Sequence, residues 1–331
     1  MFKTIAFYHQ SDKRVKNDYF LDNYDNTNEY VKFRDELGYE VHSLDIYTKQ
    51  KREPDICIFL DMPTFNIEKV IDRTKTKTVV MLREAEMISG RNYDKNRHNE
   101  FDIVLTWKRD LVDNKKYFFF PSTRFVKSKI SDVENYLNRK LLTLINSNLT
   151  SNIEGELYSK RLDTVKWFEI NHLNDFDLWG YGWDEWRFVL KNRTFFRSKL
   201  LAPKRISYKG MAKDKQETMS QYKFSVCFEN TNLIRDYISE KIFDSFLSQT
   251  VPIYWGAPNI DEIIPKNCFI DFRDFNNYEE LYAYIKNMTN KDYMQYIENI
   301  NTFLESRDAY IFTLDNWIKS LNKALIHIGE Q

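Results

Sequence analysis

The chain has 331 residues, 42% of them hydrophobic, which is enough for two domains with buried cores. Its 49 basic and 49 acidic side chains leave no net charge. This balance excludes the broad basic surface that nucleic-acid binding requires, so no nucleic-acid partner is expected. Three cysteines without a CxxC spacing favour free thiols in a reducing compartment over a disulfide framework or a metal site.

The N-terminal residues lead directly into a strand pattern, without the layout of a signal peptide. No apolar stretch approaches the roughly 18 residues that a membrane span needs. We therefore expect a cytoplasmic protein, with any membrane association peripheral and at the inner membrane face.

The first part of the chain alternates strand and helix patterns. Helices are expected at 27–37, with Thr27 as N-cap and Gly38 as its end, and at 67–72. Strands are expected at 3–8, 41–44, 55–60, 78–82, 101–107 and 116–120. This alternation predicts a parallel sheet with helices on its faces.

Residues 122–139 are polar and charged, and we interpret them as a linker before a second α/β run. Residues 184–205 are basic and aromatic and receive no assignment. The second run predicts strands at 141–147, 175–180, 223–228, 251–255 and 268–272, and helices at 156–171, 259–264, 277–288, 290–305 and 309–328. The last helix carries an apolar stripe that is expected to pack on a core. The predicted division is 1–135, 136–308 and a C-terminal helix, 309–331.

Residues 222–256 predict a strand, a polar loop, a helix and a second strand, which together form one βαβ unit. Ser239 suits an N-cap, and Glu240 and Lys241 occupy the first helical turn. In such sheets ligands bind beyond the carboxyl ends of the strands, and a helix N-terminus there attracts phosphate. The alternative is an ordinary βαβ unit whose loop charges, such as Glu229 and Asp236, are solvated.

Three linked motifs lie in this stretch: FEN at 228–230, DYISEK at 236–241 and VPIYWG at 251–256. Together with DLWGYGW at 177–183, they resemble the α-1,3/1,4-fucosyltransferase family, glycosyltransferase family 10. The resemblance covers roughly 175–275 and is weak in the N-terminal half. The spacer between FEN and DYISEK is one residue longer than the family form.

The resemblance implies a GT-B α/β fold, with two Rossmann-like domains facing across a cleft. The N-terminal domain would bind an oligosaccharide or glycolipid acceptor, and the C-terminal domain GDP-fucose. The implied enzyme is an inverting fucosyltransferase, with an α-1,3 linkage to GlcNAc or glucose and no metal or other cofactor. The alternatives are another nucleotide-sugar donor, or an inactive nucleotide-sugar-binding protein.

The resemblance also implies site residues. Lys241 would contact the donor pyrophosphate, and Glu240 would bind hydroxyls of the ribose or the fucose. Asn230 and Tyr237 match donor-contacting positions. Arg161 matches an arginine that grips the phosphates, for which a bidentate guanidinium is suited; its neighbour Lys160 is the alternative.

The general base of the family is a glutamate that follows an N-domain strand. Glu84 fits this description, directly after the strand at 78–82, and Glu86 is the alternative. His9 and His98 are outside candidates. Either glutamate could instead be a solvated loop carboxylate paired with a nearby arginine.

Overall fold

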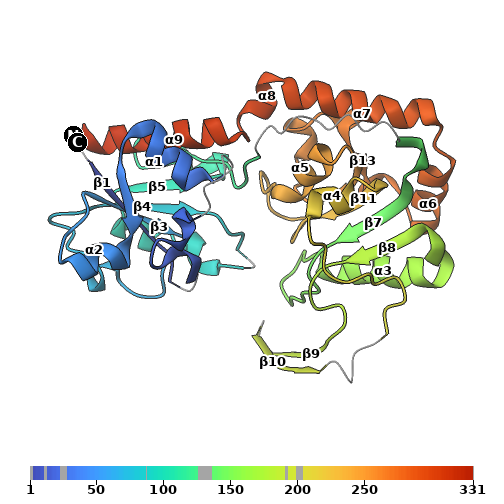
Figure 1. Ribbon diagram of the computed structural model, residues 1–331, viewed down its shortest axis with the longest axis horizontal. Helices are drawn as coiled ribbons and strands as arrows, with labels where there is room; N and C mark the ends of the chain where they lie inside the picture. The colour runs from blue at the N-terminus through green and yellow to red at the C-terminus, as the bar shows by residue number, and fades with distance from the viewer. Residues whose placement is uncertain are drawn as a thin grey trace. The chain divides into compact units, whose positions relative to one another are not determined.

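The computed structural model describes residues 3–10, 13–22, 28–86, 88–125, 136–190, 193–198 and 204–330. The chain forms two compact units, one made of residues 1–126 and 311–331 and the other of residues 127–310 (Figure 1). Within the described ranges, none of the helices combines the length and the apolar character that crossing a membrane requires.

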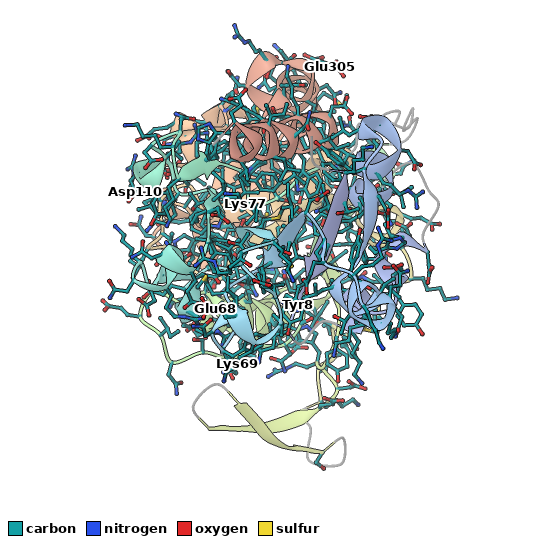
Figure 2. The ribbon with its side chains drawn as sticks, turned by 90° about the vertical axis from the view of Figure 1, so that its left-hand side faces the viewer. Tyr8, Glu68, Lys69, Lys77, Asp110 and Glu305 are labelled. Atoms are coloured by element: carbon teal, nitrogen blue, oxygen red, sulfur yellow. The ribbon has the colours of Figure 1, made fainter. Side chains whose placement is uncertain are left out.

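The first unit is built on a six-stranded sheet in which every neighbouring pair is parallel. The strand order is β2-β1-β3-β4-β5-β6. The strands are β1 (Thr4–Tyr8), β2 (Glu40–Ser43), β3 (Ile56–Leu60), β4 (Lys77–Leu82), β5 (Ile103–Thr106) and β6 (Tyr117–Phe119). All six predicted strands are therefore confirmed. Figure 2 shows the side chains of this unit, with Tyr8 at the carboxyl end of β1 and Lys77 at the amino end of β4.

The helices of the first unit depart from the prediction in three places. Helix α1 (Glu29–Leu37) is capped by Asn28, whose side chain accepts from two backbone N–H groups; the predicted cap, Thr27, was wrong and lies outside the described residues. Helix α2 (Leu44–Gln50) was not predicted, because its first residue continues the strand pattern of β2. The helix predicted at 67–72 is a single 3-10 turn, since Val70 leaves helical geometry.

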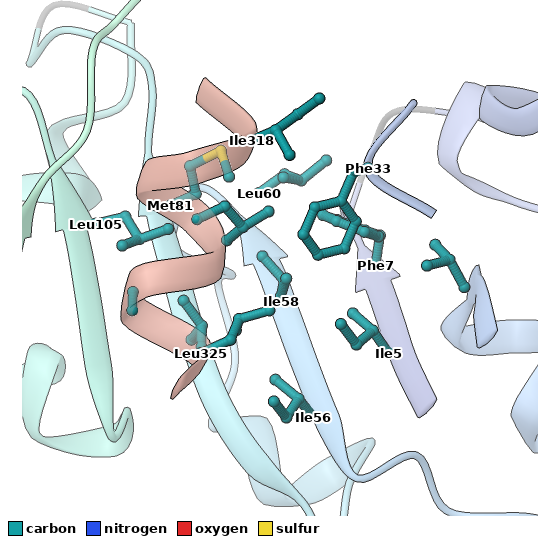
Figure 3. Close-up of a cluster of buried hydrophobic side chains, with 14 of the residues drawn as sticks. Ile5, Phe7, Phe33, Ile56, Ile58, Leu60, Met81, Leu105, Ile318 and Leu325 are labelled. Atoms are coloured by element: carbon teal, nitrogen blue, oxygen red, sulfur yellow. The ribbon is translucent and has the colours of Figure 1, made fainter. Parts of the chain in front are cut away.

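Helix α9 (Leu314–Gly329) belongs to the first unit, although it follows the whole of the second unit in sequence. Its apolar stripe packs on the strands, as predicted, and Figure 3 shows Ile318 and Leu325 among side chains of β1, β3 and β4. The single helix predicted at 309–328 is divided instead. Helix α8 (Arg307–Tyr310) ends before Thr313, and the Thr313 side chain caps α9.

The second unit contains a five-stranded parallel sheet of order β13-β12-β11-β7-β8. Its strands are β7 (Lys140–Ile145), β8 (Phe176–Trp179), β11 (Tyr222–Phe228), β12 (Val251–Trp255) and β13 (Ile270–Asp271). Its helices, besides α8, are α3 (Tyr158–Asn171), α4 (Lys215–Met219), α5 (Glu240–Leu247), α6 (Tyr278–Asn287) and α7 (Asn290–Glu305). A 3-10 turn, Ile260–Glu262, replaces the helix predicted at 259–264.

The unassigned stretch at 184–205 contains a hairpin, which is the part of the second unit that departs most from a Rossmann-like plan. Strands β9 (Trp186–Leu190) and β10 (Arg193–Ser198) pair antiparallel in a separate two-stranded sheet (Figure 1). The βαβ unit predicted at 222–256 is confirmed, since β11 and β12 pair in parallel and α5 connects them.

Candidate active site

The carboxyl end of β11 carries the polar loop that the sequence singled out. The loop runs from Glu229 to Ser239, and α5 begins at Glu240. Ser239 is the N-cap, as predicted, because its side chain accepts from the backbone N–H of Lys241. The start of α5 therefore lies at the edge of the sheet where ligands of parallel sheets bind.

Arg161 extends from the first turns of α3 into this loop. Its side chain is only 3% exposed, and its guanidinium lies 4.8 Å from the centroid of the Tyr158 ring. Nη2 donates to the backbone oxygen of Phe228 at 2.7 Å and to Oδ1 of Asn230 at 3.0 Å. Both acceptors are neutral oxygens, and within the described part of the chain Nε has no hydrogen-bond partner. Burial lowers the pKa of Arg161, as expected for a cation taken out of water.

Asn230 connects Arg161 to Tyr237. Its Nδ2 donates to the Tyr237 hydroxyl at 3.2 Å, and the Tyr237 side chain is 4% exposed. The structure thus brings together three of the five residues predicted to bind the donor, from α3 and from both ends of the loop. An asparagine amide suits this place, because it can accept from one neighbour and donate to the other.

Lys241 contacts a buried carboxylate, which was not predicted. Its Nζ lies 3.2 Å from Oε2 of Glu229 and 2.8 Å from Oγ of Ser239. Glu229 is fully buried, so the interpretation of Glu229 as a solvated loop charge was wrong. Its position directly after an apolar strand was the signal in the sequence that could have indicated burial.

Glu240 is exposed at the start of α5. Desolvation by the surrounding protein acts to raise the pKa of Glu240. The positive charges of Lys241 and Lys215, the backbone N–H of Glu240 and the charge of Arg161 outweigh this effect and lower the pKa. Lys215 in turn pairs with Asp244 at 2.5 Å. Glu240 is therefore a carboxylate kept ionised by a group of nearby cations, and it can accept hydrogen bonds from ligand hydroxyls.

Other charged residues near this loop contact partners outside the Arg161–Asn230–Tyr237 cluster. Arg235 forms an exposed ion pair with Glu262 at 2.7 Å. Asp236 has a positive φ of 65° and exchanges hydrogen bonds with Asn259. Lys160, the alternative to Arg161, has a 46% exposed side chain that lies 3.6 Å from an aspartate one helical turn away. Of the two side chains, it is therefore Arg161 that reaches the loop at the carboxyl end of β11.

The first unit contains a cavity of about 550 Å³ at the carboxyl ends of β1, β3 and β4. Its lining includes His9, Asp61, Arg83, Glu84 and Arg91. This volume lies in the range of about 300–1,000 Å³ that is typical of small-molecule sites. Glu84, the predicted base, is half-buried in it.

Asp61 fixes the backbone that carries Glu84. Its Oδ1 accepts from the N–H groups of Arg83 at 2.8 Å and Glu84 at 3.1 Å, and from Nδ2 of Asn92 at 2.6 Å. Asp61 is buried and has a positive φ of 66°, a conformation that aspartate tolerates better than most residues. The sequence analysis missed Asp61, although it directly follows the buried strand β3.

The other candidate bases differ from Glu84. Glu86 is exposed and is not among the residues that line the cavity. His98 was a wrong candidate: it is 1% exposed and its ring nitrogens contact the Tyr117 hydroxyl and the backbone oxygen of Asn92, each at 3.1 Å. Burial lowers the pKa of His98, so it is a neutral core residue. His9 lines the same cavity as Glu84.

Among the residues that the structure describes, no group of three or more His, Cys, Asp or Glu side chains is arranged to hold a metal ion.

The fold resembles solved glycosyltransferase structures. A crystal structure of α1,3-fucosyltransferase with GDP superposes with a TM-score of 0.59 at 19% identity, over 97% of this chain and 89% of that chain. The same enzyme class with GDP-fucose gives 0.59 at 18% identity and the same coverage. TarM gives 0.54 at 12% identity, over 85% of this chain and 57% of that chain. The predicted GT-B class, with two parallel-sheet α/β domains, is confirmed.

Sequence comparison narrows this class to one family. Residues 147–313, just over half of the chain, match glycosyltransferase family 10 (fucosyltransferase), C-terminal part. The chain belongs to this family, which confirms the predicted resemblance. The matched segment includes all five residues predicted to bind the donor, whereas Glu84 lies outside it.

Curated relatives match over short segments. "Alpha-(1,3)-fucosyltransferase FucT" of Helicobacter pylori is 46% identical over 74 residues, which are 22% of this chain and 15% of that protein. "Alpha-(1,4)-fucosyltransferase" of Arabidopsis thaliana is 41% identical over 70 residues, 21% of this chain and 17% of that protein. "GDP-fucose protein O-fucosyltransferase 3" of Xenopus laevis is 41% identical over 83 residues, 24% of this chain and 18% of that protein. The alignments therefore span less than a fifth of each of these relatives.

Proposed function

We propose that this protein transfers L-fucose from GDP-fucose to a hydroxyl of a glycan. The observation that carries the proposal is the cluster at the carboxyl end of β11. There the buried guanidinium of Arg161, the Asn230–Tyr237 pair and the start of α5 lie within the segment that matches the family. A buried cation with neutral partners, beside a helix N-terminus, suits a diphosphate.

Donor binding is assigned to the second unit. Arg161 and Lys241 contact the diphosphate, together with the N–H groups at the start of α5. Glu240 accepts hydrogen bonds from hydroxyls of the ribose or the fucose. As the bond between fucose and phosphate breaks, negative charge grows on the diphosphate, and these fixed cations stabilise it.

Acceptor activation is assigned to Glu84. The acceptor hydroxyl attacks the anomeric carbon of fucose from the side opposite GDP, with inversion, and its proton passes to the Glu84 carboxylate. The products are the fucosylated glycan, GDP and protonated Glu84, which returns its proton to water. We propose an oligosaccharide or glycolipid acceptor and an α-1,3 linkage to GlcNAc or glucose, on the resemblance to the α-1,3 members.

The reaction is proposed to need no metal, because Arg161, Lys241 and the helix start supply the positive charge that the leaving diphosphate requires. The three cysteines are free and buried, which supports the proposed cytoplasmic location.

A donor and acceptor screen tests the proposal. Thermal shifts with GDP, UDP and CMP sugars identify the donor, since a ligand that binds only the folded state raises the melting temperature. Transfer from GDP-fucose to N-acetyllactosamine-type acceptors, undiminished by EDTA and with the product linkage determined, is the expected result. Preference for UDP sugars would overturn the donor assignment. Binding of GDP-fucose without transfer or hydrolysis would favour a binding protein.

A further inference from the structure

Glu229 is a buried carboxylate beside the donor residues to which the proposed reaction assigns no role. It follows β11 directly, and its side chain is 0% exposed. Burying an ionised carboxylate is costly unless it is paired and hydrogen-bonded. The groups that pair with the Glu229 carboxylate therefore indicate its role.

The partners of Glu229 form a continuous hydrogen-bond network. Oε1 accepts from the backbone N–H of Ser239 at 2.8 Å, and Oε2 accepts from the Ser239 hydroxyl at 2.6 Å. Because the hydroxyl has one proton and gives it to Glu229, it acts as an acceptor toward Nζ of Lys241, at 2.8 Å. Nζ also lies 3.2 Å from Oε2. Among the residues that the structure describes, two of the three ammonium protons of Lys241 thus have partners, and the third is available to a ligand.

The packing around Glu229 restricts its position. A Cβ atom on Gly256 would lie 2.5 Å from Cγ of Glu229 and 2.4 Å from the hydroxyl of Tyr254. The Tyr254 hydroxyl is itself held, because it accepts from the N–H of Ala257 at 3.0 Å. Glu229 and Gly256 therefore fit together at the ends of two adjacent strands, and the glycine is required for this contact.

We propose that Glu229 is a positioning residue, which holds the Lys241 ammonium and the Ser239 cap so that the remaining ammonium proton is directed to the leaving diphosphate. This inference rests on the proposed function. Glu229 and Lys241 together are neutral, so their pair contributes orientation, and Arg161 supplies the net attraction for the donor. Losing the negative charge of Glu229 would therefore misalign Lys241 without weakening donor binding.

The Glu229→Gln variant distinguishes an effect on the orientation of the Lys241 ammonium from an effect on the affinity for the donor. In either orientation of the glutamine amide, its NH₂ group faces a donor, either the Ser239 N–H or the Lys241 ammonium. A shift of about 1 Å in a catalytic group can cost about 10²-fold in rate. We expect kcat to fall about 10²-fold, while KM for GDP-fucose and Kd for GDP stay within about threefold of wild type.

A double-mutant cycle with Lys241→Met tests whether Glu229 acts through Lys241. We expect Glu229→Gln to have no further effect on kcat in the Lys241→Met background. Glu262→Gln, at an exposed glutamate of the same unit, is the matched control and should leave all constants unchanged. If Glu229→Gln does not fold, Ser239→Ala interrupts the same network, and its loss of kcat should also vanish in the Lys241→Met background.

The outcomes are distinguishable. If the losses of kcat in the two single variants multiply in the double variant, Glu229 does not act through Lys241. If the loss of kcat parallels a fall in melting temperature, the role of Glu229 is structural. Either result would overturn this inference and leave the proposed function intact. A large rise in Kd for GDP in Glu229→Gln would also overturn it. A wild-type protein that transfers no fucose from GDP-fucose overturns both the inference and the proposed function.

Discussion

Replacing Arg161 by methionine should weaken donor binding strongly while changing the stability of the unliganded protein little. The guanidinium is 3% exposed and donates to two neutral oxygens, those of Phe228 and Asn230. Its Nε has no partner among the described residues, and burial lowers the pKa of the side chain. In the absence of a ligand, the arginine is therefore an incompletely compensated buried cation.

The magnitudes follow from these contacts. Methionine leaves the backbone oxygen of Phe228 and Oδ1 of Asn230 without this donor, which costs about 1–3 kcal/mol for each group that stays unsatisfied. It also removes a buried charge, whose burial costs several kcal/mol, so the two effects largely offset each other. The free energy of unfolding should therefore change by less than about 2 kcal/mol. Loss of a buried, charged contact to phosphate costs about 2–5 kcal/mol. At about 3 kcal/mol, Kd for GDP rises roughly 150-fold.

Isothermal titration with GDP, combined with urea denaturation, measures both quantities. Lys160→Met is the matched control, since it removes the adjacent cation, whose side chain is 46% exposed and paired with Asp163. We expect its Kd for GDP to stay within about threefold of wild type, because exposed ion pairs contribute little. An equal loss of affinity in both variants, or a loss in Lys160→Met alone, would refute the assignment of Arg161.

Three further changes test other parts of the molecule. Glu84→Gln should lower kcat about 10²–10⁴-fold with Kd for GDP unchanged, whereas Glu86→Gln should remain near wild type; the reverse pattern would exchange the two roles. Burial raises the pKa of Asp177, but hydrogen bonds from Lys140, Tyr222 and Lys209 outweigh it and lower the pKa overall, so the stabilisation is present above about pH 4 and is lost as pH falls below that value. Asp177→Asn should therefore lower the free energy of unfolding by about 1–2 kcal/mol at pH 7, and urea denaturation at about pH 3 should show the difference shrinking. Leu321→Ala, at a fully buried position of α9, should destabilise the first unit by about 2–5 kcal/mol, and no change in thermal unfolding would contradict the packing of α9 on that core.

The strands of the two parallel sheets could be predicted because their residues are apolar in continuous runs, which is typical of parallel sheets buried on both faces. β3 is an example, since all five of its residues are buried. Helix α2 could not be predicted, because Ser43 and Leu44 fit the end of a strand as well as the start of a helix. The attachment of α9 to the first unit was also hidden, because an apolar stripe indicates that a helix packs on a core but not on which one.

The residues proposed to bind the donor were predicted from the family resemblance, because most of them belong to motifs within one βαβ unit. The structure confirms Ser239 as the N-cap of α5, and it places Arg161, which lies outside that unit, in contact with Asn230. The position of Glu229 after an apolar strand could have indicated its burial, but its contact with Lys241 could not be predicted. That contact depends on the direction of side chains at a strand end and on the space left by Gly256.

The cluster at the carboxyl end of β11 and the cavity of the first unit therefore depend on the sequence in different ways. In the second unit Arg161 contacts Asn230, which in turn contacts Tyr237, so a change at one of these positions disturbs its partner. We infer that this interdependence limits the substitutions that the proposed donor region tolerates. In the first unit, residues from separate strand ends line the cavity, and Asp61 holds the Glu84 backbone through N–H groups that any side chain would leave in place. Side chains around that cavity can change while this backbone stays in place, so the sequence indicates the proposed acceptor region less clearly than the proposed donor region.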